Sequence, residues 1–221
     1  MSKKINFATV NADARKALSH FFYAVYRSAE LSNEKREKAQ SHDAKIADAK
    51  SAMEKNPCAD TVTAYNAALH AKTADEKSIA ERIKGLNPFK DEGLALIPEC
   101  LYKDYCALME KETKTTRDAF NADIKTALED MGITITTETQ LTNTVGWLRS
   151  HTSGVVKSGS KTVLHSGKLT STKSKSQFNE LFVRVLIDLF VDKKVCEFGT
   201  DEENKYALVF FEYDEDGQLV K

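Results

Sequence analysis

The chain contains few of the residues that interrupt helices, with 9 Gly and 3 Pro among 221 residues. Folds made of many short strands need Gly and Pro in their frequent turns. Their scarcity therefore favours long helices. The hydrophobic fraction of 41% is high enough to form a core, which argues against a chain that is disordered throughout.

Long apolar segments are also missing. The longest apolar run, residues 207–211, is far too short to cross a membrane. Lys3 and Lys4 are not followed by the apolar stretch of a secretory signal peptide. We therefore expect a soluble, cytoplasmic protein that has no membrane partner.

Neither the cysteines nor the net charge indicates a particular ligand. Four cysteines, at positions 58, 100, 106 and 196, form no Cys-x-x-Cys pair and match no zinc module. Free, reduced thiols are the expected state in a chain long enough to fold without disulfides. The formal net charge of -1 predicts no general affinity for nucleic acid.

Motifs of known catalytic or nucleotide sites are absent as well. The five histidines lie near no Gly-x-Ser-x-Gly or cysteine motif. Residues 154–162 contain the glycines and lysine of a phosphate-binding loop, but Ser160 adds a residue between Gly159 and Lys161. We therefore predict that the protein is not an enzyme and holds no cofactor or metal ion.

The first predicted helix begins after Asn11, whose side chain can accept a hydrogen bond from a first-turn amide. Beyond Ser32 and Asn33 the sequence becomes dense in charge. Either a second helix begins there or one helix continues from residue 12 to residue 55, and the sequence leaves both alternatives open. An apolar stripe marks the buried face of the first part: Ala14, Leu18, Phe21, Phe22, Val25 and Ala29.

A helical hairpin is predicted around Asn56 and Pro57. Proline cannot continue a helix, but it suits the first position of a new one. The arms, 33–55 and 57–84, would each span roughly 35–40 Å, and such matched arms favour an antiparallel pair. The predicted seam between them, a candidate partner-binding surface, comprises Ala39, His42, Ile46, Ala49, Met53, Val62, Tyr65 and Leu69, followed by Ile79, Ile83 and Leu86.

This seam buries little apolar area, because two of its residues are alanines and Lys72 and Glu76 interrupt it. Two helices joined by such a seam are marginal alone and would gain from a partner or from self-association. His42 and His70 come to a similar level of the hairpin. By helical phase Asp43 and Asp75 point elsewhere, so the histidines are not predicted to bind a metal.

The C-terminal half is predicted to form a helical body with a small β element. Residues 87–98 are expected to connect it to the hairpin. Helices are expected around 101–108, 115–131, 137–148 and 177–193, and the last has the widest apolar face. Strands are expected at 206–213 and, shorter, at 195–198.

Residues 151–175 are rich in Ser, Thr, Gly and Lys, and no acidic residue lies between Thr139 and Asn179. The cations of this region could contact the phosphates of a nucleic acid. No aromatic residues alternate with them, so a solvated loop is the favoured interpretation. The candidate phosphate-binding residues are Arg149, Lys157, Lys161, Lys168, Lys173 and Lys175.

Together these patterns predict a mainly α protein of the α+β class. It comprises an N-terminal domain, 1–98, with a long antiparallel helical hairpin, and a compact helical domain, 99–221, with a small C-terminal β element. The leading functional hypothesis is a non-enzymatic protein-interaction protein that acts as an assembly component, adaptor or inhibitor. Its partner would be another protein or a second copy. A nucleic-acid-associated protein and an enzyme with an unrecognised site are the alternatives.

Overall fold

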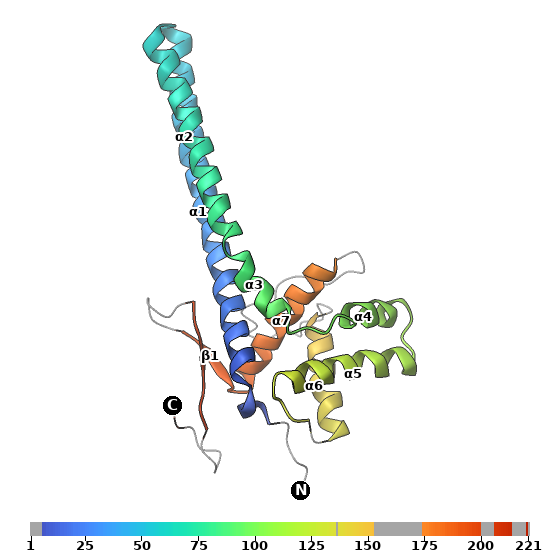
Figure 1. The fold of residues 1–221 in the computed structure, drawn as a ribbon. Coiled ribbons are helices and arrows are strands. Elements are labelled where there is room, and N and C mark those ends of the chain that lie inside the picture. The colour runs from blue at the N-terminus through green and yellow to red at the C-terminus, as the bar shows by residue number, and fades with distance from the viewer. Residues whose placement is uncertain (1–5, 136, 153–173, 200–205, 214–219, 221) are drawn as a thin grey trace. The chain divides into compact units, whose positions relative to one another are not determined.

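The computed structural model describes residues 6–135, 137–152, 174–199, 206–213 and 220. It confirms a mainly α fold with a small β element near the C-terminus (Figure 1). The elements are a short 3-10 helix, Phe7–Thr9, the helices α1 (Ala12–Lys55), α2 (Ala59–Lys84), α3 (Asn87–Leu94), α4 (Leu101–Glu110), α5 (Lys114–Asp130), α6 (Glu138–Thr152) and α7 (Lys175–Asp192), and the strands β1 (Cys196–Phe198) and β2 (Leu208–Phe210).

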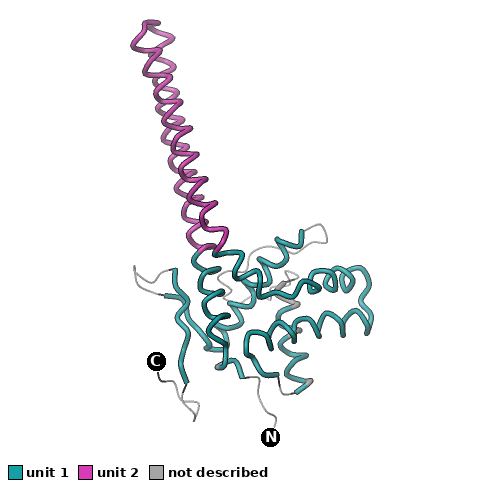
Figure 2. Tube along the Cα trace, in the orientation of Figure 1, with its two compact units in different colours: residues 1–23, 89–221 teal, residues 24–88 magenta. Residues whose placement is uncertain are grey.

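The chain divides into two compact units (Figure 2). Unit 1 comprises residues 1–23 and 89–221, and unit 2 comprises residues 24–88. The first turns of α1 thus cluster with the C-terminal part of the chain, while the rest of this helix belongs to unit 2. The division into domains 1–98 and 99–221 stays a prediction.

Helix α1 is one continuous helix of 44 residues, which decides between the two alternatives that the sequence leaves open. As predicted, Asn11 caps it: the Asn11 Oδ1 atom accepts a hydrogen bond from the Ala14 amide at 2.8 Å. Asn11 also donates from Nδ2 to the Asp130 carbonyl and from its own amide to the Met131 carbonyl, both at 2.8 Å. One residue therefore begins α1 and ties it to the end of α5.

Helix α7 forms the centre of the core of unit 1. Its predicted apolar face is buried from Phe178 to Phe190, and Val183 and Ile187 on its other side are buried too. The Tyr105 ring of α4 packs against Phe178 with ring centroids 4.6 Å apart. Because fully burying one such side chain contributes about 1.5–3 kcal/mol, α7 supplies a large share of the stability of this unit.

The helices around α7 follow the predicted pattern closely. In α5 the Thr113 hydroxyl caps the helix, and Gly132, with a φ of 87°, ends it. The Thr137 hydroxyl accepts a hydrogen bond from the Gln140 amide at the start of α6, as the sequence predicts. The predicted core positions of α4 and α5 are all buried: Leu101, Tyr105, Leu108, Phe120, Ile124 and Leu128, with Met131 next to α5.

Strands β1 and β2 form a two-stranded antiparallel sheet in which Cys196 pairs with Phe210 and Phe198 with Leu208. Both lie within the predicted strands, although β2 is shorter than the predicted range of 206–213. Part of the acidic turn expected between them, residues 200–205, lies outside the described residues.

The expectation of a plain connector over residues 87–98 is wrong, because α3 occupies Asn87–Leu94. Pro88 sits in the first turn, where the missing amide hydrogen removes no helical hydrogen bond. Gly93 is buried against α1, and a Cβ atom built on it would lie 2.5 Å from the Phe21 Cβ atom. Close packing thus overrides the weak helix propensity of glycine.

We predict that Gly93→Ala lowers the free energy of unfolding by about 1–3 kcal/mol, because the added methyl group collides with Phe21. Gly146→Ala in α6 is the matched control. Nothing lies within 4 Å of the Cβ position there, so the better helix former should stabilise by roughly 0.5–1 kcal/mol. Urea unfolding followed by circular dichroism measures both variants. Equal effects of the two substitutions would contradict the packing of α3 on Phe21.

Candidate functional site

The part of α1 that belongs to unit 2 pairs with α2 as an antiparallel hairpin, as predicted (Figures 1 and 2). Side-chain pairs join the helices, among them Glu34 with Arg82 at 3.2 Å, Lys38 with Asp75 at 3.5 Å, and Asp43 with Lys72 at 2.7 Å. Residue numbers rise along α1 as they fall along α2, which is the register of an antiparallel pair.

The turn between the helices differs from the prediction by two residues. Helix α2 begins at Ala59 with Cys58 as its N-cap, not at Pro57. The Thr61 Oγ1 atom lies 2.8 Å from the Asn56 carbonyl oxygen and accepts a hydrogen bond from the Cys58 amide at 3.1 Å. These side-chain contacts close the turn after the proline, so that Pro57 precedes the helix and does not begin it.

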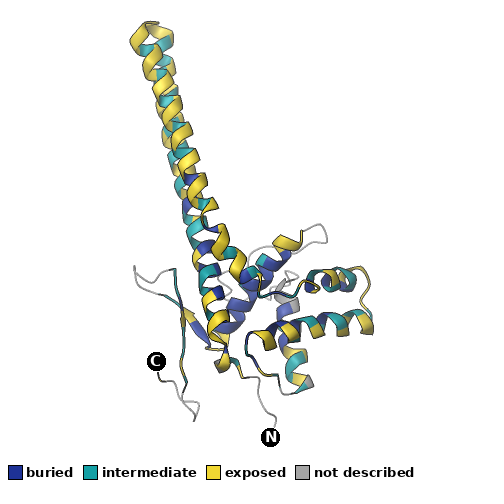
Figure 3. Ribbon diagram, in the orientation of Figure 1, coloured by how far each residue is buried: buried dark blue, intermediate teal, exposed yellow. Residues whose placement is uncertain are grey.

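Apolar packing holds the hairpin at one end. A cluster of buried side chains, formed by Ala24 and Leu31 of α1, Ile79 of α2 and Leu86, is joined by the partly buried Ile83. No residue from 32 to 78 is buried, and Figure 3 shows this stretch as partly buried and exposed along both helices. The two helices are therefore packed through a buried apolar core at this cluster and, beyond it, through side chains of mixed polarity that are only partly buried.

The predicted seam is found on α1 but is shifted on α2. The first-arm residues all lie at partly buried positions. On α2, Tyr65 is partly buried, whereas Val62 and Leu69 are 42% and 38% exposed and therefore lie outside the seam. Thr61, Ala68 and Lys72 occupy the partly buried positions instead. Apolarity alone predicts Val62 and Leu69 for the seam, whereas helical phase turns the row that contains Thr61, Ala68 and Lys72 toward α1.

His42 lies between the helices and is paired with a carboxylate. Its Nε2 atom is 3.0 Å from the Asp75 Oδ2 atom, so the expectation that Asp75 points elsewhere is wrong. The hydrogen bond with His42, helped by the charge of Lys38, holds the pKa of Asp75 below its ordinary value. His70 is exposed. No group of three or more His, Cys, Asp and Glu side chains in the described ranges is arranged to hold a metal ion.

The cysteines, all free, occupy different electrostatic environments. Cys58 is exposed in the hairpin turn, and its hydrogen bonds with Thr61 lower the pKa of its thiol. Cys100 is exposed too, but its Sγ atom donates to the Asp123 Oδ1 atom at 3.1 Å, and this carboxylate raises the pKa of the thiol. Burial raises the pKa of Cys196 to about 12.

The candidate phosphate-binding residues are not brought together in the described structure. Lys157, Lys161, Lys168 and Lys173 fall outside the described residues, and Arg149 belongs to α6. The Lys175 Nζ atom lies 3.1 Å from the Glu99 Oε1 atom. This carboxylate is distant in the sequence, so a scan of the local charges could not have found the pair.

The described helices include none with the length and apolar character needed to cross a membrane. No family model matches the chain, and the searches of curated proteins and of solved structures give no match either.

We predict that iodoacetamide at pH 7.5 alkylates Cys58 faster than Cys100, because the thiolate is the nucleophile and only the first thiol has a lowered pKa. Thr61→Val removes the hydroxyl group. It should slow the alkylation of Cys58 and leave the alkylation rate of Cys100 unchanged. Peptide mapping by mass spectrometry gives both rates from one reaction. A Cys58 rate that does not respond to Thr61→Val would show that this hydrogen bond does not set its reactivity.

The stability of the hairpin is expected to depend on pH through Asp75. The folded-state pKa of Asp75 is depressed, so its contribution to stability is present above the unfolded pKa, about 3.9, and is lost as pH falls through the folded value. Asp75→Asn should therefore destabilise the hairpin near pH 7, and the difference in stability from the parent chain should shrink as pH falls below the unfolded pKa and through the lower folded value. The rate of hydrogen exchange at the α2 amides, measured at each pH, reports this difference in stability between the variant and the parent chain.

The matched control is Asp48→Asn, which changes an exposed carboxylate on α1. It should leave the pH dependence of exchange in α2 as it is in the parent chain. A constant difference between Asp75→Asn and the parent chain across this pH range would contradict the role assigned to the pair of His42 and Asp75.

Proposed function

We propose that the protein is a non-enzymatic protein-binding protein, an assembly component, adaptor or inhibitor, whose helical hairpin is a docking surface. One observation carries this proposal: from residue 32 to residue 78 the two helices contain no buried residue. A helix pair usually derives its stability from a buried apolar face, and this stretch has none.

The polar pairs of the hairpin supply less stability than a buried apolar face would. Ion pairs between side chains as exposed as these contribute little to stability, because water and salt screen them. A partner that covers the helix pair would exclude water from these contacts and bury additional apolar area. The polar side chains are paired across the helices with each other, so they do not converge on an open site, and binding rather than catalysis is the function that fits them.

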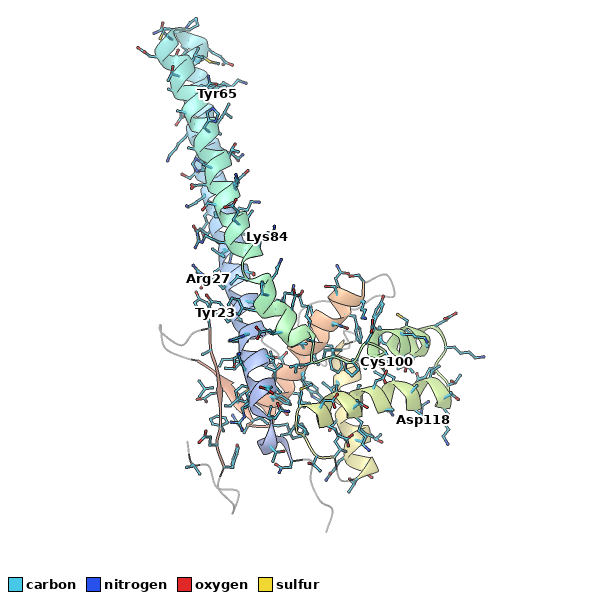
Figure 4. The ribbon with its side chains drawn as sticks, viewed as in Figure 1. Tyr23, Arg27, Tyr65, Lys84, Cys100 and Asp118 are labelled. Carbon is cyan, nitrogen blue, oxygen red and sulfur yellow. The ribbon has the colours of Figure 1, made fainter. Side chains whose placement is uncertain are left out.

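The docking face is defined by Val62 and Leu69 of α2. They are seven residues apart, which places them on one face of the helix at about 10 Å separation. Tyr65, partly buried, lies between them in the sequence and is labelled in Figure 4. An amphipathic helix of a partner protein, with apolar residues spaced seven apart, would match this row by packing lengthwise along α2.

The test compares two double variants of the full chain. Val62→Glu with Leu69→Glu places two charges on the docking face. The matched control, Ala67→Glu with Ala74→Glu, places two charges at the same spacing on a different exposed row of α2. Circular dichroism confirms that both variants keep the helix content of the parent chain.

We expect cross-linking in a lysate of the native cells to join a partner protein to the parent chain and to the control variant. For the docking-face variant, the yield of this cross-linked product should fall at least tenfold. Light scattering after gel filtration at micromolar concentration separates a foreign partner from a second copy. A partner bound equally by both variants, or a strict monomer that binds nothing, would overturn the proposal.

A further inference from the structure

Four aromatic rings of unit 1 form a surface cluster that is separate from the core around α7. It comprises His20 and Tyr23 of α1, Phe89 of α3 and Tyr206, which precedes β2; we name these four residues the aromatic patch. Ring centroids are 5.1 Å apart for His20 and Phe89, 6.1 Å for Tyr23 and Phe89, and 6.2 Å for Tyr23 and Tyr206. Figure 4 labels Tyr23 on α1.

Two of the four residues of this patch are exposed, and the other two are partly buried. Tyr23 is 38% and Phe89 37% exposed, in contrast to the buried rings of Tyr105, Phe120 and Phe178. Interplanar angles of 83° to 89° show that the rings meet edge to face. In such a pair, the ring that contributes its edge keeps both of its broad faces uncovered by the other. Those faces carry the negative end of the ring quadrupole and attract cations.

Carboxylates accompany these rings on α3. The Nδ1 atom of His20 lies 2.6 Å from the Glu92 Oε2 atom, and Asp91 next to it is exposed. Among the described residues, Glu92 bonds through its Oε2 atom, and its Oε1 atom accepts no hydrogen bond. Lys90, the cation of α3, is paired with Glu180, whose other oxygen binds Arg184 at 2.6 Å. The exposed charge of α3 beside the rings is therefore negative.

We propose that the aromatic patch together with Glu92 binds an arginine side chain of a partner protein. A guanidinium group is planar, stacks on aromatic faces and donates several hydrogen bonds to a carboxylate, so one side chain can use a ring and the Glu92 Oε1 atom together. Charge complementarity selects this occupant over an apolar one. The patch lies in unit 1 and the hairpin in unit 2, so this inference does not rest on the proposed function.

The test is a two-dimensional amide NMR titration of the full chain with N-acetyl-arginine amide. N-acetyl-citrulline amide, which has nearly the same shape but no charge, is the matched neutral probe. Exposed cation–π and ion-pair contacts are weak individually, so we expect a dissociation constant on the order of 10 mM for the arginine probe. The shifted amides should surround Phe89 and Glu92, and citrulline should leave them unchanged.

Two conservative variants examine the two halves of the patch. Phe89→Leu keeps an apolar side chain but removes a ring, and Glu92→Gln keeps the shape but removes the charge. Each should weaken arginine binding about two- to fivefold. Glu110→Gln, which neutralises an exposed carboxylate on α4, should leave it unchanged.

The lysine analogue, N-acetyl-lysine amide, tests the preference for arginine and should bind more weakly than arginine. The proposal is overturned if the arginine probe shifts nothing at 50 mM, if citrulline shifts the same amides as strongly, or if lysine binds as tightly as arginine. It is also overturned if both patch variants bind like the parent chain while keeping its dispersed spectrum.

Discussion

The contact between α1 and α2 changes character along its length, and the properties of the hairpin depend on this change. Near Leu31 and Ile79 the helices pack through a small apolar cluster. Beyond it, polar pairs connect them: His42 with Asp75 and Asp43 with Lys72. Apolar contacts stabilise a helix pair but are not directional, so they do not specify which residues meet. Paired charges contribute less stability but specify which residues face each other. One end of the hairpin therefore supplies most of its stability, and the remainder mainly defines its register.

This distribution connects the chemistry of unit 2 with its proposed use. A helix pair whose polar side chains satisfy one another can remain solvated, yet it leaves Val62 and Leu69 exposed on α2. Covering them adds apolar burial at about 25 cal/mol per Å², while the polar pairs already hold the helices in place. Since the surface is organised before binding, less conformational entropy is lost when a partner docks.

Unit 1 shows the opposite arrangement. Residues 178–190 of α7 are buried apart from Glu180 and Arg184, and the side chain of Asn11 ties the start of α1 to the end of α5. A rigid core of this kind can present exposed rings at fixed angles, which the aromatic patch requires. The two proposed surfaces differ in chemistry: the one on α2 is apolar, and the one on unit 1 is aromatic and acidic.

The sequence by itself determined the local features. The helices and most of their boundaries, the cap at Asn11, the buried face of α7 and the paired strands follow from periodicity and turn chemistry, which depend on neighbouring residues. The tertiary structure alone decided that α1 is unbroken, that Gly93 permits α3, and that Val62 and Leu69 face solvent. It also paired His42 with Asp75 and gathered Tyr23, Phe89 and Tyr206. These features depend on helical phase and on contacts between distant residues, and local patterns do not encode either.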